Sequence, residues 1–163
     1  MVAARAGLPL SILRLVEIMQ EAGLPEGVAQ VLCGPGASTG SALVAHPGID
    51  AVGFIGGTAT GRRIMADAAK GLKKVGLELG GKDPGYVMED ADIEWAVDVL
   101  MDGAMYNAGQ CCCGIERIYV HESLYDAFVE KAVAWVGGLK LGNPFDAAST
   151  LGPMANARFA AVV

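Results

Sequence analysis

The chain has 163 residues and is acidic, with 12 Lys and Arg against 18 Asp and Glu and a formal net charge of −6. Hydrophobic residues make up 53% of the chain, which is enough for a compact core. An acidic chain without a basic cluster argues against nucleic acid or a membrane surface as its main partner.

Neither a membrane span nor a secretion signal is predicted. The longest charge-free run, 27–49, contains prolines and glycines that would break a helix. Near the N-terminus, Arg14 and Glu17 interrupt the apolar residues, and no small-residue cleavage site follows them. We therefore expect a cytoplasmic protein.

The first half of the chain alternates between helices and short strands. Ser11 is expected to cap the first helix, and Gly23 to end it. The predicted helices are 11–22, 38–45 and 58–70, and the predicted strands are 28–33, 51–55 and 73–79. Strands that alternate with helices at this spacing predict an α/β fold with a parallel sheet of the dinucleotide-binding type.

The second half begins after a glycine pair, so a domain boundary is predicted near Gly80. Asp92 is expected to cap an apolar helix that runs to about Met105, and a cysteine cluster lies in the loop that follows. The other predicted elements are strands at 86–88 and 115–121, a helix at 124–136, a loop from 141 and the start of a helix near 159.

The four cysteines do not predict a disulfide framework. Cys111–Cys113 are contiguous, neighbouring cysteines do not easily bridge each other, and Cys33 alone cannot pair with all three. The triplet lacks a Cys-x-x-Cys spacing, and His46 and His121 have no partner pattern, so no metal site is expected. Reduced thiols, one of them reactive, are therefore favoured over a disulfide or a metal site. Three buried, inert thiols are the alternative, which composition alone favours.

Two segments carry groups suited to acyl-thioester chemistry. One is Glu78–Lys82 (Glu-Leu-Gly-Gly-Lys), and the other is Gln110–Cys113, preceded by Asn107 and Gly109. A thiol attacks an electrophilic carbon, and a carboxylate activates the water that releases the acyl group. Burial at the end of an apolar strand would raise the pKa of Glu78 toward the working range; the alternative is a carboxylate that faces solvent or pairs with a neighbouring lysine.

Two glycine-rich turns lead from a strand into a helix. Gly34–Gly40, with Gly36 at its centre, could present backbone N–H groups to a phosphate, although a plain tight turn is the alternative. Phe54–Gly61 opens the helix that begins at Thr58, and the N-terminus of that helix is a second candidate anion site.

Taken together, these segments resemble the aldehyde dehydrogenase superfamily. Tyr106–Cys112 resembles the active-site loop of that family, in which the nucleophile is the second residue after the Gly-Gln pair, here Cys112. Glu78–Lys82 resembles its general-base motif, and Phe54–Gly61 its Phe-Thr-Gly-Ser-Thr-x-x-Gly segment, with Ile55 in place of Thr and Gly57 in place of Ser. Further matches lie at 90–97, 117–120, 139–144 and 151–153.

The resemblance implies NAD(P)-dependent oxidation of a small aldehyde to a carboxylic acid. Cys112 would form a thiohemiacetal that becomes a thioester, Glu78 would activate the hydrolytic water, and the backbone N–H of Cys112 would donate to the oxyanion. The resemblance implies NAD or NADP as cofactor and homo-oligomeric full-length relatives. The residues expected at the cofactor are Gly36, Gly56, Gly57, Thr58, Gly61 and Leu79.

The same resemblance implies a central fragment, with residues 1–79 from the end of the NAD(P)-binding domain and 80–163 from the start of the catalytic domain. A second oxyanion donor, an Asn on an upstream segment, has no counterpart here. The Lys and Glu that contact the adenosine ribose in the family would fall at Ala3 and Ala6. Two alternatives remain open: a non-catalytic remnant or interaction module of the same fold, and a thiol-based redox protein built on the cysteine triplet.

Overall fold

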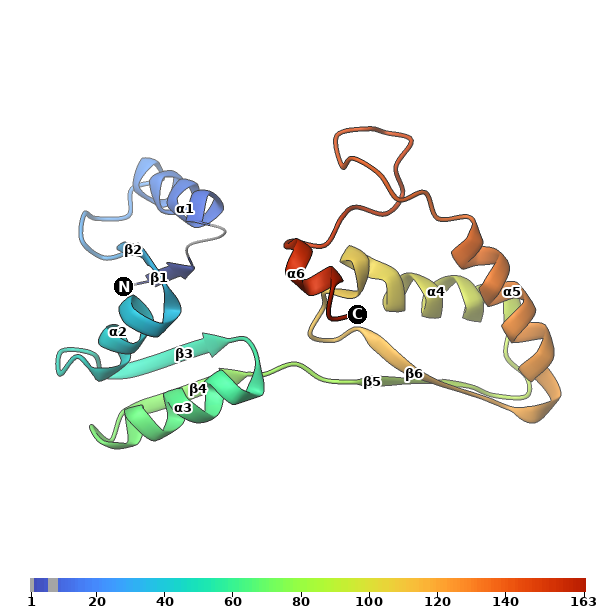
Figure 1. The fold of residues 1–163 in the computed structure, drawn as a ribbon, viewed down its shortest axis with the longest axis horizontal. Helices are drawn as coiled ribbons and strands as arrows, with labels where there is room; N and C mark the ends of the chain where they lie inside the picture. Colours follow the sequence, from blue (N-terminus) through green and yellow to red (C-terminus); the bar gives the residue numbers. More distant parts are fainter. Residues whose placement is uncertain (1, 6–8) are drawn as a thin grey trace. The chain divides into compact units, whose positions relative to one another are not determined.

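The computed structural model describes residues 2–5 and 9–163, which belong to two compact units, Met1–Leu79 and Gly80–Val163. Both units consist of parallel strand pairs joined by crossover connections that contain helices (Figure 1). This is the α/β class that the alternating pattern predicts.

The first unit contains two parallel strand pairs. Strand β1 (Val2–Arg5) pairs with β2 (Val31–Gly34) across helix α1 (Pro9–Glu21), and β3 (Ala51–Ile55) pairs with β4 (Lys74–Glu78) across α3 (Thr58–Ala69). Between β2 and β3 lie a π-helical turn, η1 (Gly36–Gly40), and the short helix α2 (Ser41–Ala45). Both pairs are parallel as predicted, but among the described residues they form separate two-stranded sheets.

Several boundaries differ from the predictions; the strand expected over 86–88, for example, begins at Asp83 and ends at Val87. Helix α1 begins at Pro9 instead of Ser11, and the turn η1 precedes the helix expected over 38–45. The strand expected from Val28 begins at Val31, because the N–H of Val28 donates to the carbonyl of Pro25 within a turn. Of the two alanines at the expected ribose positions, Ala3 belongs to β1, whereas Ala6 lies outside the described residues.

Helices α1 and α3 end in the same way, with one left-handed residue followed by a backbone hydrogen bond to the carbonyl five residues earlier. In α1 the left-handed residue is Gly23 (φ 97°), and Leu24 donates over 2.9 Å. In α3 it is Leu72 (φ 51°), and Lys73 donates over 3.1 Å. This is the Schellman motif, which favours glycine at the left-handed position.

Lys73 also joins the end of α2 to the start of β4. Its Nζ donates to the carbonyl oxygens of Val44 and His46, each over 2.6 Å. A cation at these carbonyls satisfies acceptors that the end of a helix leaves unpaired.

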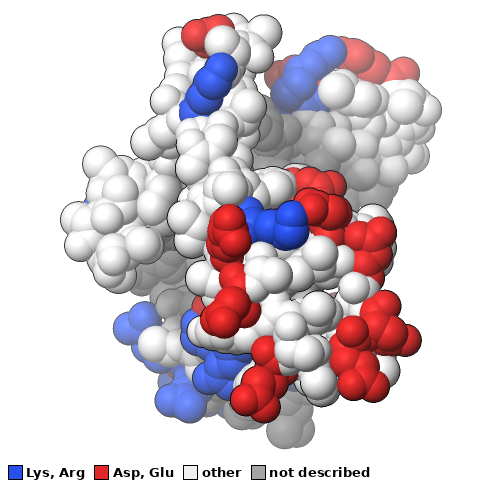
Figure 2. Space-filling model, turned by 90° about the vertical axis from the view of Figure 1, so that its right-hand side faces the viewer, with Lys and Arg blue, Asp and Glu red and all other residues white. Residues whose placement is uncertain are grey.

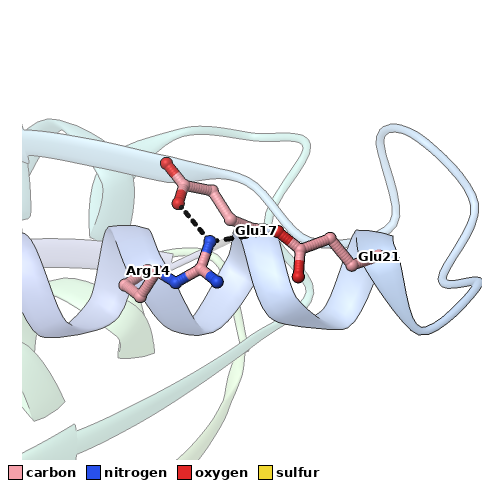
Figure 3. A network of polar contacts seen from close by, with 3 residues as sticks. All are labelled: Arg14, Glu17 and Glu21. Carbon is pink, nitrogen blue, oxygen red and sulfur yellow. Dashed lines mark hydrogen bonds and ion pairs between the residues drawn. The ribbon is translucent and has the colours of Figure 1, made fainter.

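Helix α1 carries an exposed ion-pair network (Figure 3). Nη1 of Arg14 donates to Oε2 of Glu17 and to Oε1 of Glu21, both over 3.0 Å. The hydrogen bonds to Glu17 and Glu21 raise the pKa of Arg14 above its ordinary value. A cation that binds two carboxylates along one face supports the helix as i, i+3 pairs do.

The second unit is one parallel pair covered by helices. Strand β5 (Asp83–Val87) pairs with β6 (Ile115–Val120) across α4 (Ile93–Met105), whose first turn Asp92 caps by accepting from the N–H groups of residues 94 and 95 over 3.1 and 3.2 Å. The remaining elements are η2 (Tyr106–Gly109), η3 (Glu122–Leu124), α5 (Tyr125–Gly137) and α6 (Ala157–Ala160). The buried core consists of Val87, Ala96, Val97, Met101 and Phe128.

Two glycines let α4 lie close to the strands beneath it. A Cβ built on Gly103 of α4 would be 2.7 Å from Cδ1 of Ile115, and one built on Gly85 of β5 would be 2.6 Å from Cδ2 of Leu100. These approaches fix the end of α4, and therefore the start of the cysteine loop, against the sheet.

The surface reflects the acidic composition. On the face shown in Figure 2, acidic side chains gather over part of the surface, and large areas carry no charge. Among the described residues, no helix is long and apolar enough to cross a bilayer.

Candidate active-site residues

The cysteine loop begins with three consecutive left-handed residues. After α4, Asn107, Ala108 and Gly109 have φ values of 52°, 55° and 74°. Asparagine and glycine adopt this conformation readily, whereas alanine does so at a cost of about 1–2 kcal/mol. Such strain is typical of functional segments that the surrounding structure holds in place.

Gln110 holds this strained turn through its backbone and its side chain. Its N–H and its Nε2 donate to the carbonyl of Asn107 over 3.1 and 3.0 Å, and Nδ2 of Asn107 donates back to the Gln110 carbonyl over 3.1 Å. On its other side, Oε1 of Gln110 accepts from the N–H of Ala155 over 2.9 Å. Sequence reasoning named Gln110 within the motif but missed this clamp, which pairs residues 45 positions apart.

The three cysteines lie in a tight turn. The N–H of Gly114 donates to the carbonyl of Cys111 over 3.2 Å, which places Cys112 and Cys113 at the two central positions. All four cysteines of the chain are free, and Cys112 is exposed while Cys111 is half-buried. The turn brings Sγ of Cys111 to 3.4 Å from Sγ of Cys113.

Hydrogen bonding within the turn shifts the pKa values of the two flanking thiols in opposite directions. The backbone N–H of Cys113 and then its thiol hydrogen-bond the sulfur of Cys111, and these bonds lower the pKa of Cys111. The same contact with Cys111, followed by the charge of Cys111, raises the pKa of Cys113. Hydrogen bonds to a thiolate favour the ionised form, so the turn stabilises a thiolate on Cys111.

The end of the Glu78–Lys82 motif lies beside this turn. A Cβ built on Gly81 would be 3.3 Å from the carbonyl oxygen of Cys112. Nζ of Lys82 forms an ion pair with Oε2 of Glu116, close to the cysteines along the chain. The second unit therefore brings part of the predicted general-base motif against the predicted nucleophile's turn.

Glu78 itself ends β4 in the first unit, and its side chain is exposed. The burial that we expected at this strand end is therefore absent from this unit. Among the described residues, Glu78 forms no ion pair with Lys73 or Lys74. Its carbonyl accepts from the N–H of Gly56 over 2.9 Å, which ties the predicted base to the predicted cofactor turn.

The N-terminus of α3 lies at the same carboxyl edge of the β3–β4 pair. Gly57 is its N-cap residue, and no described side chain caps it; Thr60 and Gly61 donate to the Gly57 carbonyl over 3.0 and 3.1 Å. No described heavy atom lies within 4 Å of a Cβ built on Gly57. An uncapped helix N-terminus with open space above it suits an anion such as a pyrophosphate, so this turn, which runs on to Thr58, fits a dinucleotide.

Three of the predicted cofactor residues show different degrees of crowding. A Cβ built on Gly61 would lie 2.5 Å from Cδ2 of Leu79, and one built on Gly56 would lie 2.5 Å from Cζ of Phe54. Around Gly36 there is open space. In the turn that Gly36 opens, however, the N–H groups of residues 38 and 39 donate to the Pro35 carbonyl, so they are already used within the turn.

A cavity of about 270 Å³ lies behind the strained turn in the second unit. Tyr106, Asn107, Ala108, Trp135 and Leu151 are among the residues that line it. Sequence reasoning missed this cavity, because residues distant along the chain line it. Among the described residues, no group of His, Cys, Asp and Glu side chains is arranged to hold a metal ion.

The first unit thus carries a carboxylate at a strand end and an uncapped helix N-terminus, and the second unit carries an exposed thiol on a tight turn. Comparison with known proteins gives the family. The family model described as "Aldehyde dehydrogenase family" matches residues 4–163, and the chain belongs to this family. This confirms the resemblance found in the sequence.

Among curated proteins, the chain is similar to betaine aldehyde dehydrogenase of Bacillus subtilis (strain 168), with 40% identity over 95% of the chain and 32% of that protein. It is 43% identical to human mitochondrial aldehyde dehydrogenase over 89% of the chain and 28% of that protein. The chain thus spans about a third of the length of the curated relatives it matches.

Solved structures are also similar to this chain. PnpE from Pseudomonas sp. WBC-3 superposes with a TM-score of 0.93 at 40% identity, covering 96% of this chain and 32% of that one. The NAD⁺ complex of aldehyde dehydrogenase from Bacillus cereus gives a TM-score of 0.92 at 39% identity, with the same coverage. These matches confirm the predicted fold class.

Proposed function

We propose that this chain carries the nucleophile and the general base of an NAD(P)-dependent aldehyde dehydrogenase. One observation carries the proposal. Cys112 is exposed at a central position of its turn, and its carbonyl oxygen lies against Gly81, three residues after Glu78. Membership of the family supports the same assignment.

The proposed reaction uses two groups of the chain in turn. The thiolate of Cys112 attacks the aldehyde carbon, and the backbone N–H of Cys112 donates to the resulting oxyanion. The turn at Gly57 and Thr58 would hold a dinucleotide, whose nicotinamide would accept the hydride lost when the thiohemiacetal is oxidised to a thioester. Glu78 then takes a proton from water, the hydroxyl adds to the thioester carbon, and the C–S bond breaks to release the carboxylic acid.

The residues at the carboxyl edge of β3 and β4 would hold the cofactor. The uncapped N–H groups around Gly57 and Thr58 would hold the pyrophosphate, and Gly61 and Leu79, which pack on each other, would belong to the same site. Gly36 and Gly56 complete the predicted set. PnpE and the Bacillus cereus enzyme have been solved with NAD, which supports NAD or NADP as the proposed cofactor.

The division into a cofactor-binding unit, 1–79, and a catalytic unit, 80–163, belongs to the same proposal. Among the relatives are betaine aldehyde dehydrogenases, so a small aldehyde is the proposed substrate. A cytoplasmic location and homo-oligomeric full-length relatives stay predictions.

The test measures two reactions: hydrolysis of an activated aryl ester, which needs Cys112 and Glu78 alone, and aldehyde-dependent reduction of NAD⁺. Cys112→Ala should abolish both. Cys33→Ala is the matched control, because Cys33 is also an exposed free thiol but lies on β2 in the other unit. Ester hydrolysis that survives Cys112→Ala at the Cys33→Ala rate would overturn the assignment and support the non-catalytic alternative.

A further inference from the structure

The turn Cys111–Gly114 holds two thiols in a reactive arrangement that the proposed dehydrogenase chemistry does not use. Sγ of Cys111 and Sγ of Cys113 are 3.4 Å apart and in hydrogen-bond contact. A disulfide bond is about 2.0 Å long, so rotation of the two side chains would bring the sulfurs together. Neither thiol is deeply buried, since Cys113 is exposed and Cys111 half-buried.

We propose that Cys111 and Cys113 form a redox pair that closes a reversible disulfide on exposure to a hydroperoxide and leaves Cys112 reduced. The proposal concerns the residues on either side of the nucleophile and is independent of the aldehyde chemistry.

The turn assigns different roles to the two thiols. The N–H and thiol of Cys113 stabilise the thiolate of Cys111, so Cys111 is the attacking residue and Cys113 the resolving one. The thiolate of Cys111 attacks the terminal oxygen of the hydroperoxide, the O–O bond breaks, and an alkoxide or hydroxide leaves. The thiol of Cys113 then displaces hydroxide from the sulfenic acid, and the S–S bond forms as water leaves.

The geometry also explains why Cys112 is not the partner. A disulfide between adjacent residues closes a small ring through their shared peptide bond, which resists distortion from planarity. Residues separated by one position avoid this constraint, and the turn already brings Cys111 and Cys113 together. A closed pair would fix the turn that presents Cys112.

The test treats the full chain with one equivalent of hydrogen peroxide and blocks the remaining thiols with iodoacetamide. It then reduces the protein and labels the released thiols with N-ethylmaleimide. Peptide mapping should find N-ethylmaleimide on both Cys111 and Cys113, and iodoacetamide on Cys112 and Cys33. Dithiothreitol added before the blocking step should remove the N-ethylmaleimide label completely.

Two variants sharpen the test. Cys113→Ser should lose the reducible pair completely and leave Cys111 as a sulfenic acid that dimedone traps, while Cys33→Ser should behave as the unaltered chain. Cys112→Ser should still close the Cys111–Cys113 disulfide. N-ethylmaleimide on Cys112 with either neighbour, or oxidation of the three thiols independently of one another, would overturn the proposal.

Discussion

Gly81 lies against the carbonyl oxygen of Cys112, so that a Cβ built on Gly81 would be only 3.3 Å from this oxygen and 3.1 Å from Oδ1 of Asp83. The contact joins two sequence motifs through residues that lie 31 positions apart. A glycine here allows the backbone after Glu78 to approach the turn that carries the proposed nucleophile.

Gly81→Ala should therefore disturb the cysteine turn without touching any proposed reacting group. The added methyl group requires the Cys112 carbonyl to move by a few tenths of an ångström, and we expect aryl-ester hydrolysis to slow by about 3- to 10-fold. Gly152→Ala is the control, because no described atom lies within 4 Å of its Cβ position. Equal rates in the two variants would show that this contact does not position Cys112.

The packing of Gly61 on Leu79 gives a stability prediction. Gly61→Val would force Leu79 from its place and should lower the free energy of unfolding by about 1–3 kcal/mol, measured in urea. Gly76→Val, at a position with open space, should change it by less than about 0.5 kcal/mol.

A second substitution checks the cause. Leu79→Ala makes room for the larger side chain, so the combined variant should be more stable than the sum of the two single effects. Strict additivity would mean that Gly61 and Leu79 do not pack as described.

Local patterns predicted much of the fold. The strand Ala51–Ile55 was predicted with its observed bounds, and Asp92 caps α4 as expected, because alternation and capping depend on residues close in sequence. The predicted start of a strand at Val28 was wrong. Val28 begins an apolar run, but it ends a turn from Pro25, and the strand begins only at Val31. The pairing of the strands depends on tertiary contacts, and so does their separation into two-stranded sheets. Local sequence patterns do not encode these contacts.

The left-handed residue at the end of α3 gives a third prediction. Leu72 is 93% exposed and has φ 51°, so its side chain strains the backbone and packs on almost nothing. Leu72→Gly should stabilise the protein by about 1 kcal/mol, seen as a higher urea midpoint. The matched reversal, Gly23→Leu at the equivalent position of α1, should destabilise it by a similar amount. A loss of stability in Leu72→Gly would contradict the strain.

Cys111 and Cys113 should differ in the pH at which they are alkylated. Because hydrogen bonds from Cys113 lower the pKa of Cys111, alkylation of Cys111 by iodoacetamide should rise at a lower pH than that of Cys113, whose pKa is raised. Mass spectrometry of each labelled peptide measures both profiles. Cys113→Ala removes the thiol donor but keeps the backbone N–H, so the Cys111 profile should move part of the way to higher pH. Superimposed profiles in the unaltered chain would contradict this difference.

The candidate site was predictable in kind but not in arrangement. The motifs identified Cys112 and Glu78 as candidates because their residue types and order carry the resemblance. The contact between Cys111 and Cys113 was not foreseen, because it depends on a turn whose hydrogen bond the sequence does not reveal. The expected burial of Glu78 was inferred from apolar neighbours along β4, yet alternate residues of a strand face opposite sides.

We propose that Cys112 forms an acyl intermediate and that Glu78 activates the water that hydrolyses it; the mass of the Glu78→Gln variant after mixing with an activated aryl ester tests both roles. We predict one acyl group per chain, mapped to Cys112, with a single burst of released phenol and no further turnover, while the control Glu26→Gln turns over like the unaltered chain. Turnover by Glu78→Gln at the unaltered rate would show that Glu78 is not the base, and an acyl group on Cys111 or Cys113 in place of Cys112 would show that Cys112 is not the nucleophile.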